Sequence, residues 1–280
     1  MKAAPPVMPA LITPFAADGV IDERAHRSNV TVLRARGVRG FLIGGSTGLG
    51  PYLDPGERAV LVGAARDELG DDGFLLGGVA GQAVAQAARQ CEELAGAGAD
   101  AALVLTPTLL LRGNHALVAA FFTAVADRSP LPLFLYTVPA VTGYELPIDT
   151  AVDLARHPNI VGMKDSGGDV ERIPPILDAV SAFHIYTGAS RSVHDATRNG
   201  ADGAITASSN YAADLVVKAR TDAAAQERLT TVSGSVEAYG VPGTYAAAEL
   251  SGLTPGALRA PLRPLDPASR EHVRSLCCPP

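Results

Sequence analysis

The 280-residue sequence is poor in cysteine, in long apolar runs and in clustered positive charge, and each shortage excludes a class of protein. Its three cysteines, Cys91, Cys277 and Cys278, have the spacing of neither a metal site nor a disulfide framework. No apolar stretch approaches the ~20 residues that a membrane span needs, so we expect no membrane partner. The net charge of −6 and the lack of a basic run argue against a nucleic-acid partner.

The amino-terminal segment does not have the pattern expected of a signal peptide. Residues Met1 to Pro9 include three prolines and lack the apolar core of a signal peptide. The few cysteines fit a reducing compartment, so we expect a cytoplasmic protein. The six histidines are scattered, without a His-x-x-x-His pair or acidic companions, so we expect no metal site.

Lysine is also scarce, because only Lys2, Lys164 and Lys218 accompany the many arginines. Lys164 follows the apolar run 160–163, which indicates a short buried strand, and residues 165–168 are typical of a loop. An amine can lose a proton and attack a carbonyl, whereas a guanidinium cannot. Burial at a strand end would lower the pKa of such a lysine from ~10.4 toward neutrality. The alternative is a lysine that leaves the strand and reaches solvent.

Short apolar runs alternate with alanine-rich helical stretches along most of the chain. Asp22 and Asn114 are predicted helix caps, and Asp54-Pro55 a predicted helix start. The expected strands lie within 9–14, 40–43, 74–76, 101–105, 131–136, 160–163, 183–186 and 203–205. Eight strand–helix units at a spacing of roughly 25 to 30 residues match an α/β (β/α)8 TIM barrel with additional C-terminal helices. We place the barrel in residues 1–208 and a helical extension, packed on it as one structural unit, in 209–280.

The active site of such a barrel lies at the carboxyl ends of its strands. The residues expected at those ends are Ser46, Thr47, Thr106, Tyr136, Lys164, Gly188 and Ile205. We therefore expect one lysine, one phenol and one hydroxyl-bearing glycine loop to lie together at this end of the barrel, which we call the mouth. This convergence is a stronger argument than any of the motifs taken alone.

Each of the other elements has a functional and a structural interpretation. The loop 44–48 offers backbone N–H groups and two hydroxyls to a carboxylate or phosphate, or is an ordinary glycine-rich turn. Tyr136 can pass protons, or can be a hydrogen-bonded tyrosine of the barrel rim. Ser166 can orient a ligand, or can cap the following helix.

Three motifs, in this order on the expected strands, resemble the dihydrodipicolinate synthase/N-acetylneuraminate lyase family of class I, Schiff-base aldolases. They are Gly45-Ser46-Thr47-Gly48, Tyr136-x-Val138-Pro139 and Gly162-Met163-Lys164. The resemblance extends through Tyr239-Gly240-Val241-Pro242-Gly243. Within the family, residues 157–169 and Arg259-Ala260-Pro261-Leu262 look most like the 4-hydroxy-2-oxoglutarate aldolase branch.

The resemblance implies a role for each candidate residue. Lys164 forms an imine with a 2-oxo acid, and Tyr136 relays protons. The loop residues Gly45, Ser46 and Thr47 hold the carboxylate, with Thr47 also on the proton path. Three further residues bind the substrate: Ser166, Gly188 and Ile205. No cofactor or metal is implied, because the iminium polarises the substrate as a metal ion otherwise would. The resemblance also implies a homotetramer built from dimers, or a homodimer.

Three positions depart from the family pattern. Val141 stands where dihydrodipicolinate synthases carry an arginine that holds the second substrate, which argues against that activity. Leu49 stands where the family often has glutamate, so the hydroxyl loop must be supported differently. Residues 106–111 lack the tyrosine that, in many members, completes a relay across a subunit interface.

We therefore predict a pyruvate-dependent aldolase, a carbon–carbon lyase that cleaves or forms a 4-hydroxy-2-oxo acid. An example is the conversion of 4-hydroxy-2-oxoglutarate to pyruvate and glyoxylate. One alternative is 4-hydroxy-tetrahydrodipicolinate synthase, or another dehydratase or hydratase-aldolase of the family that acts on a sugar acid or aryl substrate. The other is a non-catalytic barrel that binds an oxo acid, an alternative that the lost tyrosine motivates.

Overall fold

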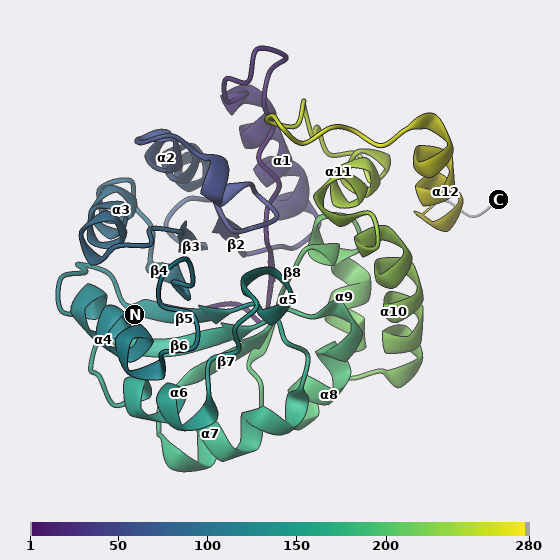
Figure 1. Ribbon diagram of the computed structural model, residues 1–280. Coiled ribbons are helices and arrows are strands. Elements are labelled where there is room, and N and C mark those ends of the chain that lie inside the picture. Colours follow the sequence, from purple (N-terminus) through teal and green to yellow (C-terminus); the bar gives the residue numbers. More distant parts are fainter. Residues whose placement is uncertain (1, 278–280) are drawn as a thin grey trace.

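The computed structural model describes residues 2–277, so Cys278 of the carboxyl-terminal cysteine pair lies outside the described residues. Eight parallel strands form a barrel that is ringed by helices (Figure 1). The strand order is β1-β8-β7-β6-β5-β4-β3-β2, and a parallel bridge between Ala10 and Leu42 brings β1 next to β2. The predicted (β/α)8 barrel is thereby confirmed.

Eight strands are present as expected, and all but the first lie within about three residues of their expected ranges. They are β1 (Val7–Pro9), β2 (Gly40–Ile43), β3 (Phe74–Val79), β4 (Ala101–Leu105), β5 (Leu133–Thr137), β6 (Ile160–Asp165), β7 (His184–Thr187) and β8 (Gly203–Thr206). The first strand was misplaced: we expected it at residues 10–12 within 9–14, but β1 covers 7–9, and Asn210 binds the backbone of the expected segment. The Asn210 amide accepts from Ile12 N at 3.1 Å and donates to Ala10 O at 2.8 Å.

Helices follow the strands as expected. They are α1 (Glu23–Ala35), α2 (Glu57–Leu69), α3 (Val84–Gly96), α4 (His115–Ala126), α5 (Pro139–Thr142), α6 (Ile148–Ala155), α7 (Ile173–Ala179) and α8 (Val193–Arg198). Asp22 and Asn114 cap α1 and α4 with their side chains, as predicted. The start predicted at Asp54-Pro55 is wrong, because Gly56 takes a left-handed conformation and α2 begins only after it.

Four further helices follow β8 and lie to one side of the barrel, next to α8 and α1 (Figure 1). They are α9 (Ala213–Ala219), α10 (Ala223–Glu237), α11 (Gly240–Leu250) and α12 (Pro267–Cys277). Arg259 ties the segment between α11 and α12 to the barrel. Its guanidinium contacts both carboxylate oxygens of Glu57 at 2.5 and 2.6 Å and lies over the Phe15 ring. The division of the chain at residue 208 remains a prediction.

Apolar side chains fill the interior of the barrel, as this architecture requires. They include Met8, Leu42, Leu76, Leu103, Phe134 and Ile205, each no more than 1% exposed. A second, larger apolar layer lies between the strands and the ring of helices. Polar side chains enter the interior at the carboxyl ends of the strands, so these ends are where a site can form.

Among residues 2–277, no helix combines the length and the apolar character that a membrane crossing demands. The cytoplasmic location remains a prediction.

Candidate active site

Strands β5 and β6 place Tyr136 and Lys164 side by side. The two residues are register partners, and both side chains enter the barrel interior. Lys164 is only 4% exposed, and its Nζ lies 4.3 Å from the centre of the Tyr136 ring. The Tyr136 hydroxyl in turn lies 3.5 Å from Ser46 Oγ on the loop after β2. Three of the predicted site residues, from three different strands, therefore meet.

The charge of Lys164 acts on the Tyr136 phenol. Burial would raise the pKa of this phenol, but the neighbouring groups outweigh it. The Lys164 ammonium and hydrogen bonding with Ser46, Lys164 and Ser166 hold the pKa of Tyr136 below its ordinary value of 10. A phenol of this kind gives up its proton more readily than a free tyrosine, which suits a proton relay.

Gly188, which follows β7, lies directly against the Lys164 side chain. A Cβ atom at this position would stand 1.9 Å from Ser166 Oγ and 2.7 Å from Lys164 Cε. Both Ser166 and Gly188 are thus in contact with the lysine pocket. Ile205 is fully buried in the interior cluster that also contains Tyr136. The roles of these three residues in substrate binding remain predictions.

The hydroxyl loop after β2 is tightly wound. Gly44 adopts a φ of +68°, and a Cβ at Gly48 would stand 2.5 Å from the Leu11 carbonyl oxygen. Ser46 and Thr47 are the partly exposed residues of this loop, whereas their glycine neighbours are buried. Gly45, Ser46 and Tyr136 line a small cavity at the mouth. Ser46 therefore faces the same cavity as Tyr136, and the role of Thr47 remains a prediction.

Arg58 on α2 supports the hydroxyl loop, a role that was not predicted. It is 3% exposed, donates from Nε to Gly78 O at 3.1 Å and also donates to Gly50 O. Burial lowers its pKa, against the opposing charges of Glu93 and Glu57. The Leu49 side chain, which replaces the family's glutamate, is buried in the core. In the sequence, nothing distinguishes Arg58 from Arg66, the other arginine of α2, which is only partly buried.

Glu237, the last residue of α10, contacts the segment after β7, a contact that was not predicted. Its carboxylate accepts a hydrogen bond from Ser190 Oγ at 2.6 Å. Partial dehydration raises the pKa of Glu237, while Ser190 and the positive charges of Arg191 and Lys164 oppose that rise. No sequence signal marked this residue, because α10 lies outside the strand–helix units that define the mouth.

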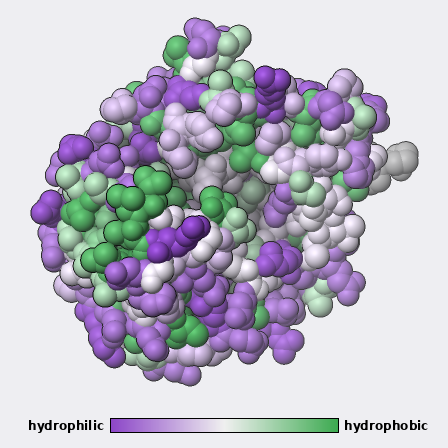
Figure 2. Space-filling view, viewed as in Figure 1, coloured by the Kyte–Doolittle hydropathy of each residue, from purple (hydrophilic) through white to green (hydrophobic). Residues whose placement is uncertain are grey.

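Residues 106–111 bring no phenol to the site. The Thr106 side chain is buried and donates to Tyr136 O at 2.7 Å, which ties β4 to β5. Leu109 and Leu110 are 78% and 89% exposed, and Val141 on α5 is 70% exposed. Figure 2 shows an apolar patch on the side of the molecule where α4 lies in Figure 1.

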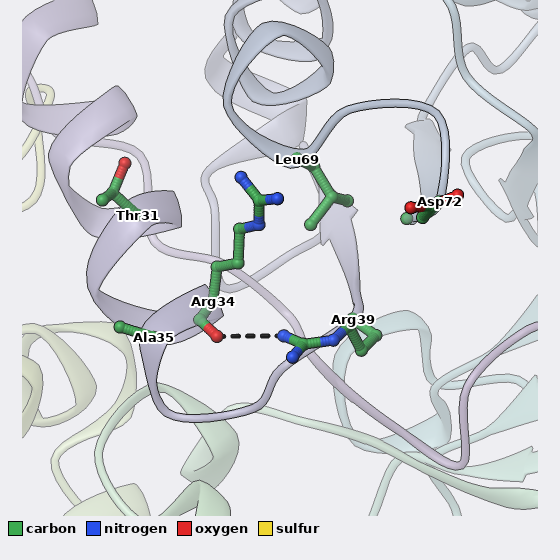
Figure 3. Close-up of a pocket in the computed structure, with 7 residues that line it drawn as sticks. Thr31, Arg34, Ala35, Arg39, Leu69 and Asp72 are labelled. Atoms are coloured by element: carbon green, nitrogen blue, oxygen red, sulfur yellow. Dashed lines mark hydrogen bonds between the residues drawn. The ribbon is translucent and has the colours of Figure 1, made fainter.

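A hollow of about 540 Å³ between α1 and α2 lies away from the mouth (Figure 3). Its two arginines are engaged with backbone carbonyls: Arg39 donates to Arg34 O at 3.0 Å, and Arg34 donates to Glu68 O at 2.6 Å. It adjoins Gly73, which precedes β3, and therefore lies toward the amino ends of the strands. Active sites of such barrels lie at the opposite end, so we do not assign one here.

Comparison with known proteins identifies the family. The model of the dihydrodipicolinate synthetase family matches residues 4–277. This chain belongs to the dihydrodipicolinate synthetase family. The family members are pyruvate-dependent lyases or aldolases that form a Schiff base, so the chain is a carbon–carbon lyase. The family resemblance seen in the sequence is confirmed.

Relatives in this family carry the name 4-hydroxy-tetrahydrodipicolinate synthase. The protein of that name from Stenotrophomonas maltophilia is 36% identical over 202 residues, which cover 72% of this chain and 68% of the relative. Synthase 1 of Streptomyces coelicolor is 33% identical over 270 residues, which cover 92% of this chain and 88% of the relative. The comparisons do not specifically show the 4-hydroxy-2-oxoglutarate aldolase branch.

Solved structures show the same fold. The dihydrodipicolinate synthase of Acinetobacter baumannii, complexed with pyruvate, is 27% identical with a TM-score of 0.89, and the match covers 98% of each chain. A prophage protein of the family from Escherichia coli K12, also in complex with pyruvate, is 25% identical with a TM-score of 0.90. That match covers 99% of this chain and 98% of the other.

Proposed function

We propose that this lyase is a pyruvate-dependent aldolase that cleaves or forms a 4-hydroxy-2-oxo acid through an imine on Lys164. The observation that carries the proposal is the buried Lys164 amine, 4.3 Å from the Tyr136 ring centre at the carboxyl end of β6. Two structural relatives that hold pyruvate support pyruvate as the shared substrate or product. Ser46 and Thr47, with the backbone of Gly45, would hold its carboxylate.

The chemistry follows from these positions. The Lys164 amine, once it has lost a proton, adds to the 2-oxo carbon, and water leaves to give an iminium. Tyr136 lies beside the nitrogen and is suited to carry protons in this step. The iminium accepts the electron pair of the bond between the third and fourth carbons. An aldehyde departs, and the enamine that remains is protonated and hydrolysed to pyruvate.

For the second substrate we favour glyoxylate, which corresponds to cleavage of 4-hydroxy-2-oxoglutarate. Val141 argues against the synthase activity, because it presents an exposed apolar side chain where the synthases carry an arginine. The names of the relatives favour a second candidate, the synthesis of 4-hydroxy-tetrahydrodipicolinate. That seven-carbon product, less pyruvate, requires a four-carbon amino-acid aldehyde.

A substrate panel tests the proposal. Purified protein is assayed for pyruvate release from 4-hydroxy-2-oxoglutarate, and for pyruvate consumption with glyoxylate or with the four-carbon amino-acid aldehyde. Lys164→Ala should abolish every activity while the barrel stays folded. The control, Lys218→Ala, changes an exposed helical lysine and should leave the activities unchanged. Activity of Lys164→Ala near that of the wild type would contradict the proposal. Stabilisation by pyruvate without turnover would favour the non-catalytic alternative.

We further propose that the chain assembles as a homodimer or as a homotetramer of dimers. The exposed apolar side chains of Leu109 and Leu110 support an assembly that covers this face. Sedimentation of the wild type and of Leu110→Lys tests this. A wild type that sediments as a monomer at micromolar concentration would contradict it.

A further inference from the structure

We propose that Arg172 is a positioning residue of the active site, which holds Ser166 against the Lys164 side chain by way of the Asp165 carboxylate. Arg172 acts through Ser166 and not on the reacting atoms. The inference rests on the proposed aldolase function and deepens it, because it assigns the group that fixes the loop after the lysine.

Ser166 lies against the lysine. A Cβ atom at Gly188 would stand 1.9 Å from Ser166 Oγ and 2.7 Å from Lys164 Cε. Ser166 is also one of the groups whose hydrogen bonding lowers the pKa of the Tyr136 phenol. A shift of Ser166 would therefore change the surroundings of both residues that carry the proposed chemistry.

The residue between Lys164 and Ser166 points the other way. Successive side chains of a strand face opposite sides, so Asp165 faces outward while both of its neighbours face the lysine pocket. Its carboxylate is buried and has two partners. Gly167 N donates to Oδ1 at 2.7 Å, and Arg172 Nε donates to Oδ2 at 3.1 Å. The carboxylate therefore fixes the turn in which Ser166 stands.

Arg172 ties this turn to the segment that follows β5. It is 7% exposed, donates to the Leu146 carbonyl, and lies 3.3 Å from the Glu145 carboxylate. Leu146 N in turn donates to Thr137 Oγ1 at 3.2 Å. Thr137 follows Tyr136 at the end of β5. The guanidinium therefore joins the end of β6 to the end of β5.

The contacts of Arg172 require a guanidinium. An arginine presents several N–H donors in a fixed planar fork, whereas a lysine ammonium is a compact point charge. The Nε of Arg172 binds Asp165, and its terminal nitrogens bind Leu146 and Glu145. A carboxylate buried without a partner is costly, so Asp165 and the turn that it holds would move if Arg172 were lost.

Arg66 on α2 offers a matched control at the opposite end of the barrel. Its guanidinium contacts Asp100 Oδ2 at 2.6 Å and donates to Gly73 O at 3.0 Å and to Gly98 O at 3.1 Å. These three residues precede β3 and β4, so this ion pair supports the amino ends of the strands. Loss of Arg66 should therefore reduce stability without disturbing the mouth.

The test is a double-mutant cycle between Arg172→Met and Ser166→Ala, with Arg66→Met as the control. Both arginine variants should lower the midpoint of urea unfolding. Activity is measured with the substrate of the panel that turns over fastest. Arg172→Met should lower its kcat/KM by about 100-fold, the scale of loss for a misplacement of about 1 Å, and Arg66→Met should not. In the Ser166→Ala background, Arg172→Met should cause no further loss, because the group through which it acts is already gone.

Three results would overturn the assignment. In the first, Arg172→Met keeps kcat/KM within about threefold of the wild type. In the second, Arg172→Met causes the same fold-loss in the Ser166→Ala background as in the wild type, which would make its role independent of Ser166. In the third, Arg66→Met lowers kcat/KM as much as Arg172→Met does, which would make the loss a general effect of stability.

Borohydride trapping of the pyruvate imine on the wild type distinguishes these failures from that of the proposed function. A wild type that forms the imine upholds the function, whatever the cycle shows for Arg172. A wild type that forms no imine fails the proposed function, and this inference fails with it.

A second variant keeps the proposal testable if Arg172→Met does not fold. Arg172→Lys keeps a positive charge beside Asp165 but lacks the fork that reaches the Leu146 carbonyl at the same time. Its kcat/KM should fall about tenfold, the scale of one lost hydrogen bond, and the fall should disappear in the Ser166→Ala background. A folded Arg172→Lys protein with full activity would overturn the assignment.

Discussion

Gly188 leaves the space that the Lys164 side chain occupies, because a Cβ atom at Gly188 would stand 2.7 Å from Lys164 Cε. Gly188→Ala should therefore displace the amine and lower kcat/KM by about 100-fold, the scale of loss for a misplacement of about 1 Å. The matched control is Gly63→Ala, in the interior of α2, where a Cβ meets nothing within 4 Å. That variant should keep full activity and gain about 0.5–1 kcal/mol of stability. Equal activity in the two variants would refute this steric account.

Tyr136→Phe removes the phenol whose pKa Lys164 and the neighbouring hydroxyls lower. We expect kcat to fall ~10²- to 10⁴-fold, because proton transfer to and from the imine nitrogen loses its carrier. The control is Tyr186→Phe, because Tyr186 is the register partner of Lys164 on the other side and its hydroxyl donates to Ala4 O. Steady-state kinetics of the two variants separate a role in chemistry from one in packing. A Tyr136→Phe enzyme as active as Tyr186→Phe would remove Tyr136 from the mechanism.

Arg58→Met should weaken both stability and pyruvate binding. It would leave the carbonyls of Gly50 and Gly78 without their buried donor, at a cost of about 1–3 kcal/mol. Because the loop 44–50 would loosen, KM for pyruvate should rise more than kcat falls. Urea unfolding and steady-state kinetics check both effects, with Arg89→Met, at an exposed arginine of α3, as the control. An unchanged KM would show that Arg58 does not support the carboxylate site.

His26 makes the fold sensitive to acid. It is 1% exposed, its Nε2 lies 3.0 Å from Leu61 O, and burial lowers its pKa from 6.5 to about 4. In the unfolded chain His26 therefore binds a proton below pH 6.5, whereas in the folded chain it binds one only below about pH 4. Stability is complete above pH 6.5 and falls as the pH drops through this window, by at most about 3 kcal/mol.

Urea unfolding of the wild type and of His26→Gln between pH 7 and 4 measures this contribution. Glutamine keeps a donor for Leu61 O and does not titrate, so its stability should fall less steeply. Parallel curves for the two proteins would mean that His26 does not carry the acid sensitivity.

The barrel and the residues at the centre of the site could be predicted from the sequence for a physical reason. Parallel strands end at one rim, so Ser46, Tyr136 and Lys164 had to meet once their strands were recognised. Arg58 could not be predicted, because it lies on a helix and acquires its role through burial and contacts made only in three dimensions. The substrate branch also stays a prediction, because apolar side chains at the rim do not specify an aldehyde.

The most direct test of the central claim is borohydride reduction in the presence of pyruvate, followed by intact-mass measurement and peptide mapping. We predict one reduced pyruvate adduct per chain, located on Lys164 and missing from Lys164→Ala. A folded wild-type protein that gains no adduct, or that carries it on another residue, would contradict the account.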